Sequence, residues 1–315
     1  LIISTLLYCV PKGSLRPVWT TDVDAEIFRL WPTSTEDKLL VGKYQRDQNA
    51  PFTMELRGED KGRLFLSRSF KVGIIAFFGR LDGSFVALHS DLQIHERNAS
   101  GREDFRRLPI PEDKILEAAF SGDGKIVFVA SLGGYLSCHP TSGETTLAPY
   151  WREPMPPSLP LLVSIGKGKF VTTLSMNGTL IVRNLMTGAL KRSAQLTERS
   201  SASVAAISGS QVVVVQSAPG AELVSIDCSD DKIAESRIIR LPAVAGRVTK
   251  LAVSIDGRWV GAINGDGKLM VFDAVAGEPL FHGAVPRSDF IIVGNRGFLY
   301  LASKNGTLGK YTFKM

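Results

Sequence analysis

The feature that most constrains this chain is a turn signal that returns at nearly regular intervals. Each of these turns ends at a glycine or an aspartate, and successive turn ends are 39 to 46 residues apart in the sequence. A fixed period of this length predicts one supersecondary unit repeated along the chain. The turn positions are Gly62, Gly101, Gly143, Gly188, Asp231 and Gly277.

Residues 251–285 show the repeated unit most clearly. Two apolar segments, 259–263 and 269–272, lie between turns that end in glycine. Asp-Gly and Asn-Gly pairs allow the positive φ values that tight hairpins need, so they belong between strands. The unit is therefore predicted to be four short strands, named a to d in chain order. Its turns are Asp256-Gly257, Asp266-Gly267 and Ala276-Gly277.

Copies of this unit cover the chain. Clear copies lie at 116–146 and 161–192, and looser ones begin near residues 26, 73 and 203. The last copy, 289–315, supplies strands a, b and c only, while the apolar run at 1–10 has no unit of its own. We expect residues 1–10 to supply the missing strand d of this last unit. The units could then close into a ring that leaves no free sheet edge at either end of the chain.

A period near 40 residues with four short strands per unit is typical of a β-propeller. We predict an all-β fold, a seven-bladed β-propeller of four-stranded blades, as one domain over residues 1–315. The approximate blades are 24–68, 70–108, 114–150, 159–196, 203–241, 248–285 and 289–315.

The unit resembles the repeat of WD40-type β-propellers in a degenerate form. Residues 271–273 (Val-Phe-Asp) and 225–227 (Ser-Ile-Asp) stand where that family often ends strand c with Trp-Asp, and the family's Gly-His pair is absent. The segment 177–190 is also similar to quinoprotein-type propeller repeats, which leaves the subfamily open. The WD40 resemblance implies a scaffold that binds other proteins.

Composition and charge bound the class of partner. The chain has 37 basic and 31 acidic residues and a net charge of +6, with the two signs interspersed. This mixture favours weak attraction to an acidic partner, and we do not expect a specific nucleic-acid ligand. No apolar run approaches the roughly 18 residues of a membrane-spanning helix, so membrane insertion is not expected.

Cysteine usage indicates the compartment. Cys9, Cys138 and Cys228 are odd in number and far apart, a pattern that favours small buried thiols over a disulfide framework or a zinc site. A reducing, intracellular location, cytoplasmic or nuclear, is expected. Residues 1–10 could instead be a signal-peptide remnant, but they lack a basic start and a small-residue cleavage site, so a strand is favoured.

No arrangement of residues points to catalysis. The chain has no G-x-S-x-G elbow and no phosphate-binding loop. His89 and His95 could meet across a hairpin, but two imidazoles without a third ligand make a poor metal site. The inner a strands read as apolar and predict a packed centre. We therefore predict no catalytic, cofactor-binding or metal-binding residues.

Two long connections and one basic edge are candidate contacts for a protein partner. Residues 149–160 contain aromatic, arginine and methionine side chains among five prolines. These three kinds of side chain are typical of interface cores. The alternative is that the aromatic side chains cap the core of the fold. Residues 11–25 hold Trp19, for which a structural role is favoured, and both connections are expected on one rim. Basic residues on the outer strands of the second blade either dock an acidic partner or protect the edge. The candidates are Tyr150, Trp151, Arg152, Met155, Trp19, Arg102, Arg106 and Arg107.

The sequence thus favours a non-catalytic protein–protein interaction scaffold. We expect it to be a subunit, or the N-terminal domain, of a larger multiprotein assembly in trafficking, the nucleus or transcription. One alternative is a propeller enzyme or small-ligand binder that uses the central channel. The other is a nucleic-acid-associated propeller that uses basic blade edges, which would require a strongly salt-dependent affinity.

Overall fold

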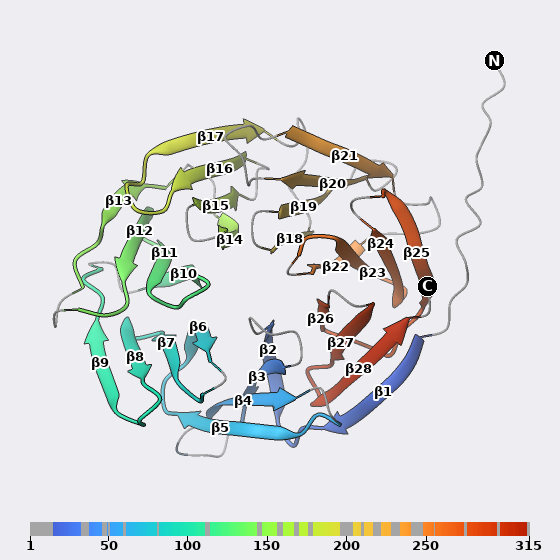
Figure 1. Ribbon diagram of the computed structural model, residues 1–315, viewed down its shortest axis with the longest axis horizontal. Coiled ribbons are helices and arrows are strands. Elements are labelled where there is room, and N and C mark those ends of the chain that lie inside the picture. Colours follow the sequence, from blue (N-terminus) through green and yellow to red (C-terminus); the bar gives the residue numbers. More distant parts are fainter. Residues whose placement is uncertain are drawn as a thin grey trace.

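The chain forms a ring of small antiparallel sheets in a computed structural model (Figure 1). No helix occurs in the part of the chain that is described, and hence none there is long and apolar enough to cross a membrane. The described residues are 15–32, 38–45, 49, 51–58, 61–80, 82–110, 114–143, 147–155, 160–166, 170–175, 179–195, 204–208, 211–216, 222–227, 234–240, 248–254, 256–273, 276–294 and 297–313.

Each sheet has four strands and is one blade of a β-propeller. Blades 1 to 3 comprise β2 (Glu26–Pro32), β3 (Lys38–Tyr44), β4 (Phe52–Gly58), β5 (Leu64–Phe70); β6 (Ile74–Gly79), β7 (Phe85–His89), β8 (Gln93–Arg97), β9 (Glu103–Arg107); β10 (Ile115–Phe120), β11 (Ile126–Ser131), β12 (Tyr135–Pro140), β13 (Trp151–Pro154).

Blades 4 to 6 comprise β14 (Pro160–Gly166), β15 (Phe170–Ser175), β16 (Thr179–Asn184), β17 (Leu190–Gln195); β18 (Val204–Ser208), β19 (Gln211–Gln216), β20 (Glu222–Asp227), β21 (Ala234–Arg240); β22 (Val248–Val253), β23 (Trp259–Asn264), β24 (Lys268–Asp273), β25 (Glu278–Ala284). The last sheet comprises β26 (Phe290–Val293), β27 (Phe298–Ala302), β28 (Thr307–Phe313) and β1 (Leu15–Asp22).

The way the ring closes corrects the sequence-based fold. Six blades are each built from four consecutive strands, whereas the remaining sheet is a composite of both chain ends. Its outer strand is β1 and not residues 1–10, which lie outside the described residues. β1 pairs antiparallel with β28 from Leu15 opposite Phe313 to Asp22 opposite Thr307. An outer strand covers the core with one face only, so β1 is largely exposed and carries no apolar signal.

The hairpin turns follow the predicted chemistry. Gly306, in the Asn-Gly turn between β27 and β28, has a φ of 99°, and its amide donates to the carbonyl of Ser303 at 3.1 Å. A Cβ atom at Gly306 would lie 2.2 Å from the carbonyl oxygen of Val23, which belongs to the connection that enters blade 1. Glycine is therefore required at this position both by backbone conformation and by close approach.

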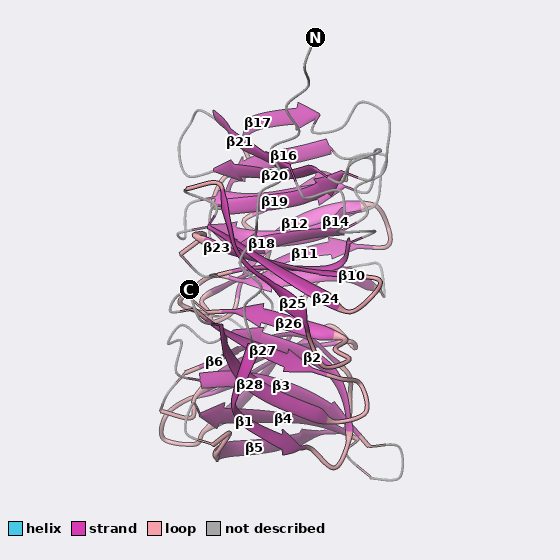
Figure 2. Ribbon diagram, turned by 90° about the vertical axis from the view of Figure 1, so that its right-hand side faces the viewer, coloured by secondary structure: helices cyan, strands magenta, loops and turns pink. Residues whose placement is uncertain are grey.

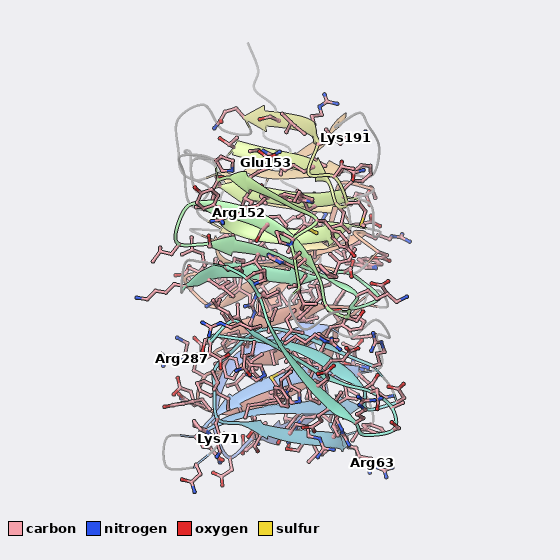
Figure 3. All side chains as sticks on the ribbon, turned by 90° about the vertical axis from the view of Figure 1, so that its left-hand side faces the viewer. Arg63, Lys71, Arg152, Glu153, Lys191 and Arg287 are labelled. Carbon is pink, nitrogen blue, oxygen red and sulfur yellow. The ribbon has the colours of Figure 1, made fainter. Side chains whose placement is uncertain are left out.

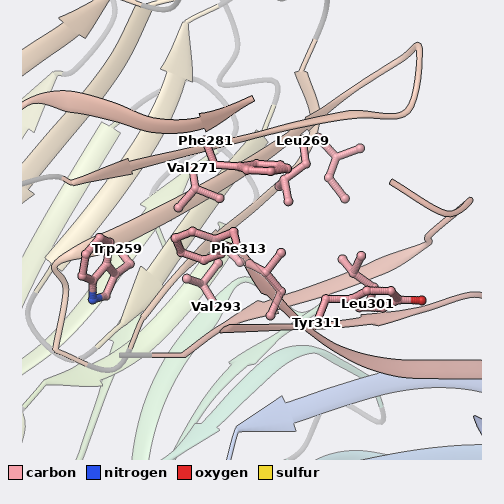
Figure 4. Packing of buried hydrophobic residues seen from close by; sticks show 11 residues of the cluster. Trp259, Leu269, Val271, Phe281, Val293, Leu301, Tyr311 and Phe313 are labelled. Atoms are coloured by element: carbon pink, nitrogen blue, oxygen red, sulfur yellow. The ribbon is translucent and has the colours of Figure 1, made fainter. Parts of the chain in front are cut away.

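The hydrophobic core lies between neighbouring blades. Viewed from the edge, the sheets stand side by side around the ring (Figure 2). Between blades 6 and 7, Trp259 and Phe313 pack edge to face with ring centroids 6.3 Å apart, surrounded by Val271, Phe281 and Val293 (Figure 4). All five side chains are buried. Because each fully buried large apolar side chain contributes about 1.5–3 kcal/mol, these layers stabilise the ring.

Candidate interaction surface on the outer rim

The segment predicted as a contact loop, 149–160, is partly a strand. Trp151 begins β13, the outer strand of blade 3, and is only 8% exposed. Its indole Nε1 donates at 2.7 Å to the carbonyl oxygen of Leu185 in blade 4. Tyr150, one residue earlier, is 46% exposed. The loop interpretation is therefore corrected: Trp151 joins two blades, and Tyr150 is the aromatic residue that faces solvent.

The other two candidates of this segment, Arg152 and Met155, also differ from each other in exposure to solvent. Arg152 is exposed, and its guanidinium carbon lies 3.9 Å from the centre of the Tyr135 ring. Met155 is half-buried and packs against the cluster that contains Phe128 and Trp151. Arg152 thus lies at the surface over the Tyr135 ring, whereas Met155 supports the core.

Trp151 rests on a tight turn of blade 4. The turn ends at Gly188, whose φ is 68° and whose missing Cβ would lie 2.7 Å from the indole of Trp151. Arg183 fixes the turn by donating from Nη1 to the Gly188 carbonyl oxygen at 2.9 Å. We call this contact, with the residues that flank it, the blade 3–4 junction.

Exposed apolar side chains occur in the segments that form this junction. Tyr150 and Met186 are each 46% exposed, and Leu190 is 57% exposed. Met186 follows Leu185, the residue that accepts the indole hydrogen bond, while Leu190 begins β17 two residues after Gly188. Exposed apolar side chains of this size are candidates for contact with a protein partner.

Charged residues also lie near the junction in the chain. Arg152, Glu153 and Lys191 are labelled in Figure 3, which views this side of the ring. Arg152 and Lys191 are exposed, whereas Glu153 is half-buried.

Trp19, the candidate of the other long connection, lies inside β1 and not in a loop. It is 7% exposed, and its ring centroid is 6.1 Å from that of Tyr300. The indole belongs to the core between blades 7 and 1. The two long connections are thus replaced by strands over much of their length, which also corrects their expected place in loops on one rim.

The basic cluster of blade 2 is divided between core and surface. Arg106 pairs with Glu96 at 3.1 Å and with Asp104, and its Nη1 donates to the Thr141 carbonyl oxygen of blade 3 at 2.7 Å. These bonds satisfy Arg106 within the protein, so it is not open to an acidic partner. Arg102 and Arg107 are exposed.

The structure brings His89 and His95 together, with ring centroids 5.7 Å apart. Burial lowers the pKa of both side chains below the ordinary histidine value. Glu103, whose Oε2 lies 3.4 Å from His95 Nε2, opposes this shift but does not outweigh burial. No group of three or more potential metal ligands exists among the described residues.

Two other buried groups, Cys138 and His139, have structural roles. Burial raises the pKa of the Cys138 thiol to about 12, a value at which almost no thiolate nucleophile forms at neutral pH. His139 bonds the Leu147 carbonyl oxygen at 3.1 Å and the Ser137 hydroxyl at 2.8 Å.

The expectation of apolar inner strands needs correction. Arg29 of β2 reaches across the inner strand of blade 2, where its Nη1 donates to the Ile75 carbonyl oxygen at 3.3 Å. Its Nη2 then bonds Glu117 Oε1 of β10 at 3.2 Å. Arg29 and Glu117 lie outside the short apolar stretches on which the expectation of an apolar, packed centre rests. The inner wall therefore includes an ion pair that ties three blades together.

Sequence reasoning missed Met186 and Leu190, which share the junction with Tyr150. The signal was present as the Thr-Gly turn at 187–188, but the turn indicates only a hairpin. That this hairpin meets Trp151 depends on a contact between two blades, 34 residues apart in the chain.

Comparison with known proteins identifies the fold. No family model and no curated protein matches this chain. The solved β-propeller domain of Cps50 (Swd1) from Myceliophteria thermophila matches with a TM-score of 0.70, covers 95% of this chain and 99% of that chain, and is 11% identical. At this identity the similarity concerns the fold alone. The ring of four-stranded sheets and this match together show that the chain folds as a β-propeller.

Proposed function

We propose that this propeller is a non-catalytic scaffold that holds a protein partner at the blade 3–4 junction. The observation that carries the proposal is that three residues in the segments that form this junction, Tyr150, Met186 and Leu190, expose large apolar side chains. Tyrosine and methionine are enriched at the cores of protein interfaces. A partner that covers this group removes apolar surface from water, which is the main favourable term in association.

The rigidity of the site also supports binding. Trp151 is held by its indole hydrogen bond, and Arg183 holds the turn that carries Met186. Because these groups are already ordered, less conformational entropy is lost when a partner binds.

The wider role follows from the fold by analogy. The similar solved structure is a β-propeller domain. We propose that this chain is a subunit, or an N-terminal domain, of a larger multiprotein assembly of the trafficking, nuclear or transcriptional kind. Its location would be cytoplasmic or nuclear. Fold alone does not fix function, so the proposal stands on the junction.

The test compares tagged full-length proteins purified from native lysate, with and without nuclease, by quantitative mass spectrometry. The junction variant is Tyr150→Ser with Leu190→Ser, and the control is Leu132→Ser, a residue of similar exposure in a turn between β11 and β12. We expect a stoichiometric, nuclease-resistant partner that the junction variant loses and the control retains. Equal recovery by all three proteins, or no stoichiometric partner, overturns the proposal. Thermal unfolding of each variant confirms that it is folded.

A further inference from the structure

We propose that the contact between blades 1 and 2 responds to pH: it is closed while His89 and His95 are neutral and opens at the outer rim when both rings are protonated. This inference goes beyond the proposed function and does not depend on the blade 3–4 junction. We call the side chains involved the histidine contact; they are His89, His95, Glu103, Phe70, Phe85 and Phe105.

The histidine contact lies between the facing surfaces of the two blades, whose outer strands are β5 and β9 (Figure 1). The His89 and His95 rings are stacked with centroids 5.7 Å apart. Phe70, the last residue of β5, lies 5.4 Å from the first ring and 5.7 Å from the second, measured between centroids. Phe105 of β9 pairs in register with His95 and stacks on its ring at 4.1 Å. The two imidazoles are therefore enclosed by aromatic rings of both blades.

Solvent lies close to this contact on the outer rim. His89 and His95 are each 6% exposed, whereas Phe105 is 54% exposed. On the opposite face of β9, Arg106 donates to the carbonyl oxygen of Thr141 in blade 3 at 2.7 Å. Because this bond holds blade 2 on blade 3, we expect water to enter on the blade 1 side, past Phe105.

Hydrogen bonding leaves ring nitrogens of the two histidines unpaired. Among the residues that the structure describes, Nε2 of His89 and both ring nitrogens of His95 are buried without a hydrogen-bond partner. A neutral imidazole carries one N–H group and an imidazolium carries two, so protonation adds a donor. A buried donor without an acceptor destabilises the closed contact, whereas water can accept from it once the contact is open.

Glu103 can balance one of the two charges. Its Oε2 lies 3.4 Å from Nε2 of His95, and its Oε1 lies 3.8 Å from Nε of Arg97. A first proton on His95 therefore gains an ion pair, which Glu103 shares with Arg97. A second proton on His89 creates two neighbouring imidazolium rings, and like charges at this separation repel each other. The second proton is therefore the one that opens the contact.

The other charged groups around the histidine contact are mostly basic. Burial and then the charge of His95 lower the pKa of His89, and Asp91, which raises it, does not outweigh them. Burial lowers the pKa of His95, Glu103 opposes this, and Arg97 adds to the lowering. On the facing strands and adjoining connections that the structure describes, the charged side chains are Lys38, Arg68, Lys71, Asp91, Arg97, Glu103 and Arg107. Carboxylates are thus outnumbered by cations there before either histidine is protonated.

His139 of blade 3 shows the contrasting arrangement. It is also buried, and burial lowers its pKa as well. Its Nδ1 bonds the carbonyl oxygen of Leu147 at 3.1 Å, and its Nε2 bonds the hydroxyl of Ser137 at 2.8 Å. Both oxygens can accept, so an imidazolium at this position would keep both hydrogen bonds. Hydrogen bonding, and not burial alone, therefore distinguishes the histidine contact.

The size of the effect follows from proton linkage. Because the pKa values of His89 and His95 are lowered in the closed protein, the open form takes up protons first as the pH falls below the ordinary value of 6.5. From about pH 7 to about pH 5, two histidines can raise the ratio of open to closed molecules by at most about 600-fold, and one histidine by at most about 25-fold. These limits apply if the closed form binds no proton, and the ion pair with Glu103 reduces the first of them.

The test places a thiol inside the histidine contact. Ala87 is fully buried and pairs in register with His95. It belongs to the same core cluster as Phe70 and Phe85, so Ala87→Cys adds a reporter there. Purified full-length protein is treated with dithiodipyridine, which modifies thiols in mildly acidic as well as neutral solution. Mass spectrometry follows each cysteine, and its rate is divided by that of a short cysteine peptide at the same pH. Cys138, buried in blade 3, reports general unfolding in the same sample.

We expect the corrected rate at position 87 to rise by more than about 25-fold from about pH 7 to about pH 5, while that of Cys138 does not change. His89→Phe should hold the rise at or below about 25-fold, because one titrating ring is left. Glu103→Gln should enlarge the rise toward its upper limit, because His95 loses its ion-pair partner. Asp104→Asn is the matched control, since it removes a carboxylate from the opposite face of β9 and should leave the rise unchanged.

Several results would overturn the inference. A rise of about 25-fold or less at position 87 means that two protons do not open the contact. An equal rise at Cys138 means that acid unfolds the whole ring, and an undiminished rise in His89→Phe means that another group titrates. Met54→Cys, which reports from the blade 1 side of the same cluster, repeats the measurement if Ala87→Cys does not fold. Thermal unfolding at neutral pH shows which variants are folded.

Discussion

The contact of Trp151 with Gly188 predicts how strongly that glycine resists substitution. In Gly188→Ala the new Cβ lies 2.7 Å from the indole, at a φ of 68°. The left-handed backbone costs about 1 kcal/mol for a non-glycine residue, and overpacking costs about 1–3 kcal/mol. The free energy of unfolding should therefore fall by about 2–4 kcal/mol.

Gly267→Ala is the matched control, because its φ is 73° and a Cβ there meets nothing within 4 Å. It should lose only the backbone part, about 1 kcal/mol. Gly62→Ala should fall between the two, since its Cβ would lie 3.0 Å from Trp19. Urea unfolding followed by circular dichroism and fluorescence gives the three values, with coincident transitions as the check on two-state behaviour. Equal losses for Gly188→Ala and Gly267→Ala would refute the packing of the indole on the turn.

Two further predictions concern buried charge. The pKa values of His89 and His95 are lowered below the ordinary value of 6.5 in the folded protein. At a pH below 6.5 the unfolded chain therefore binds more protons than the folded protein does. The contribution of these histidines to the free energy of unfolding should be constant above pH 6.5 and should decline as the pH falls below 6.5. The measurement is the melting temperature of the wild type and of His95→Phe between neutral and mildly acidic pH. The prediction is contradicted if the melting temperature of the wild type does not change, or if that of His95→Phe declines as steeply as that of the wild type. Glu55 is 4% exposed and bonds Lys43 at 2.6 Å and Arg57 at 2.7 Å, so Glu55→Gln should cost about 3 kcal/mol in urea unfolding because two buried cations lose their partner. A loss below about 1 kcal/mol would mean that the triad is screened like a surface pair.

The hairpins were predictable because their signals are local. The Asp-Gly turn at Gly267 and the apolar segments beside it define β23 and β24, and the structure pairs Ile263 with Leu269 across that turn. A tight turn and the strands next to it depend on backbone preferences within a few residues. The same local chemistry located the repeats.

The outer strands were harder to predict because they bury little. β1 contains Pro17 and exposes most of its side chains, and β13 is only four residues long and begins at Trp151. Neither shows a regular alternation in hydrophobicity, because Trp19 is the one fully buried residue of β1 and Trp151 that of β13. The apolar run at 1–10 has the stronger strand signal, so the sequence predicts it, and not residues 15–22, as the closing strand.

The junctions could not be predicted because each is assembled from two blades. Trp19 and Gly62, like Trp151 and Gly188, belong to neighbouring repeats, and which side chain meets which turn depends on the ring. Sequence analysis did select Tyr150 and Trp151 by composition. It could not tell that one is buried and the other exposed, because that difference is set by the direction of the strand.

The fold accounts for exposure at the rim but not for its hydrophobic character. An outer strand has no neighbour on its free edge, so some side chains at positions such as Leu64 and Leu190 must face water whatever their type. Polar residues would serve the fold equally well there and would reduce the risk of aggregation. Leu190 is instead apolar and lies two residues after Gly188, on which the indole of Trp151 packs. The partner proposed for the blade 3–4 junction would cover this leucine, and the requirements of the propeller alone do not call for an apolar residue there.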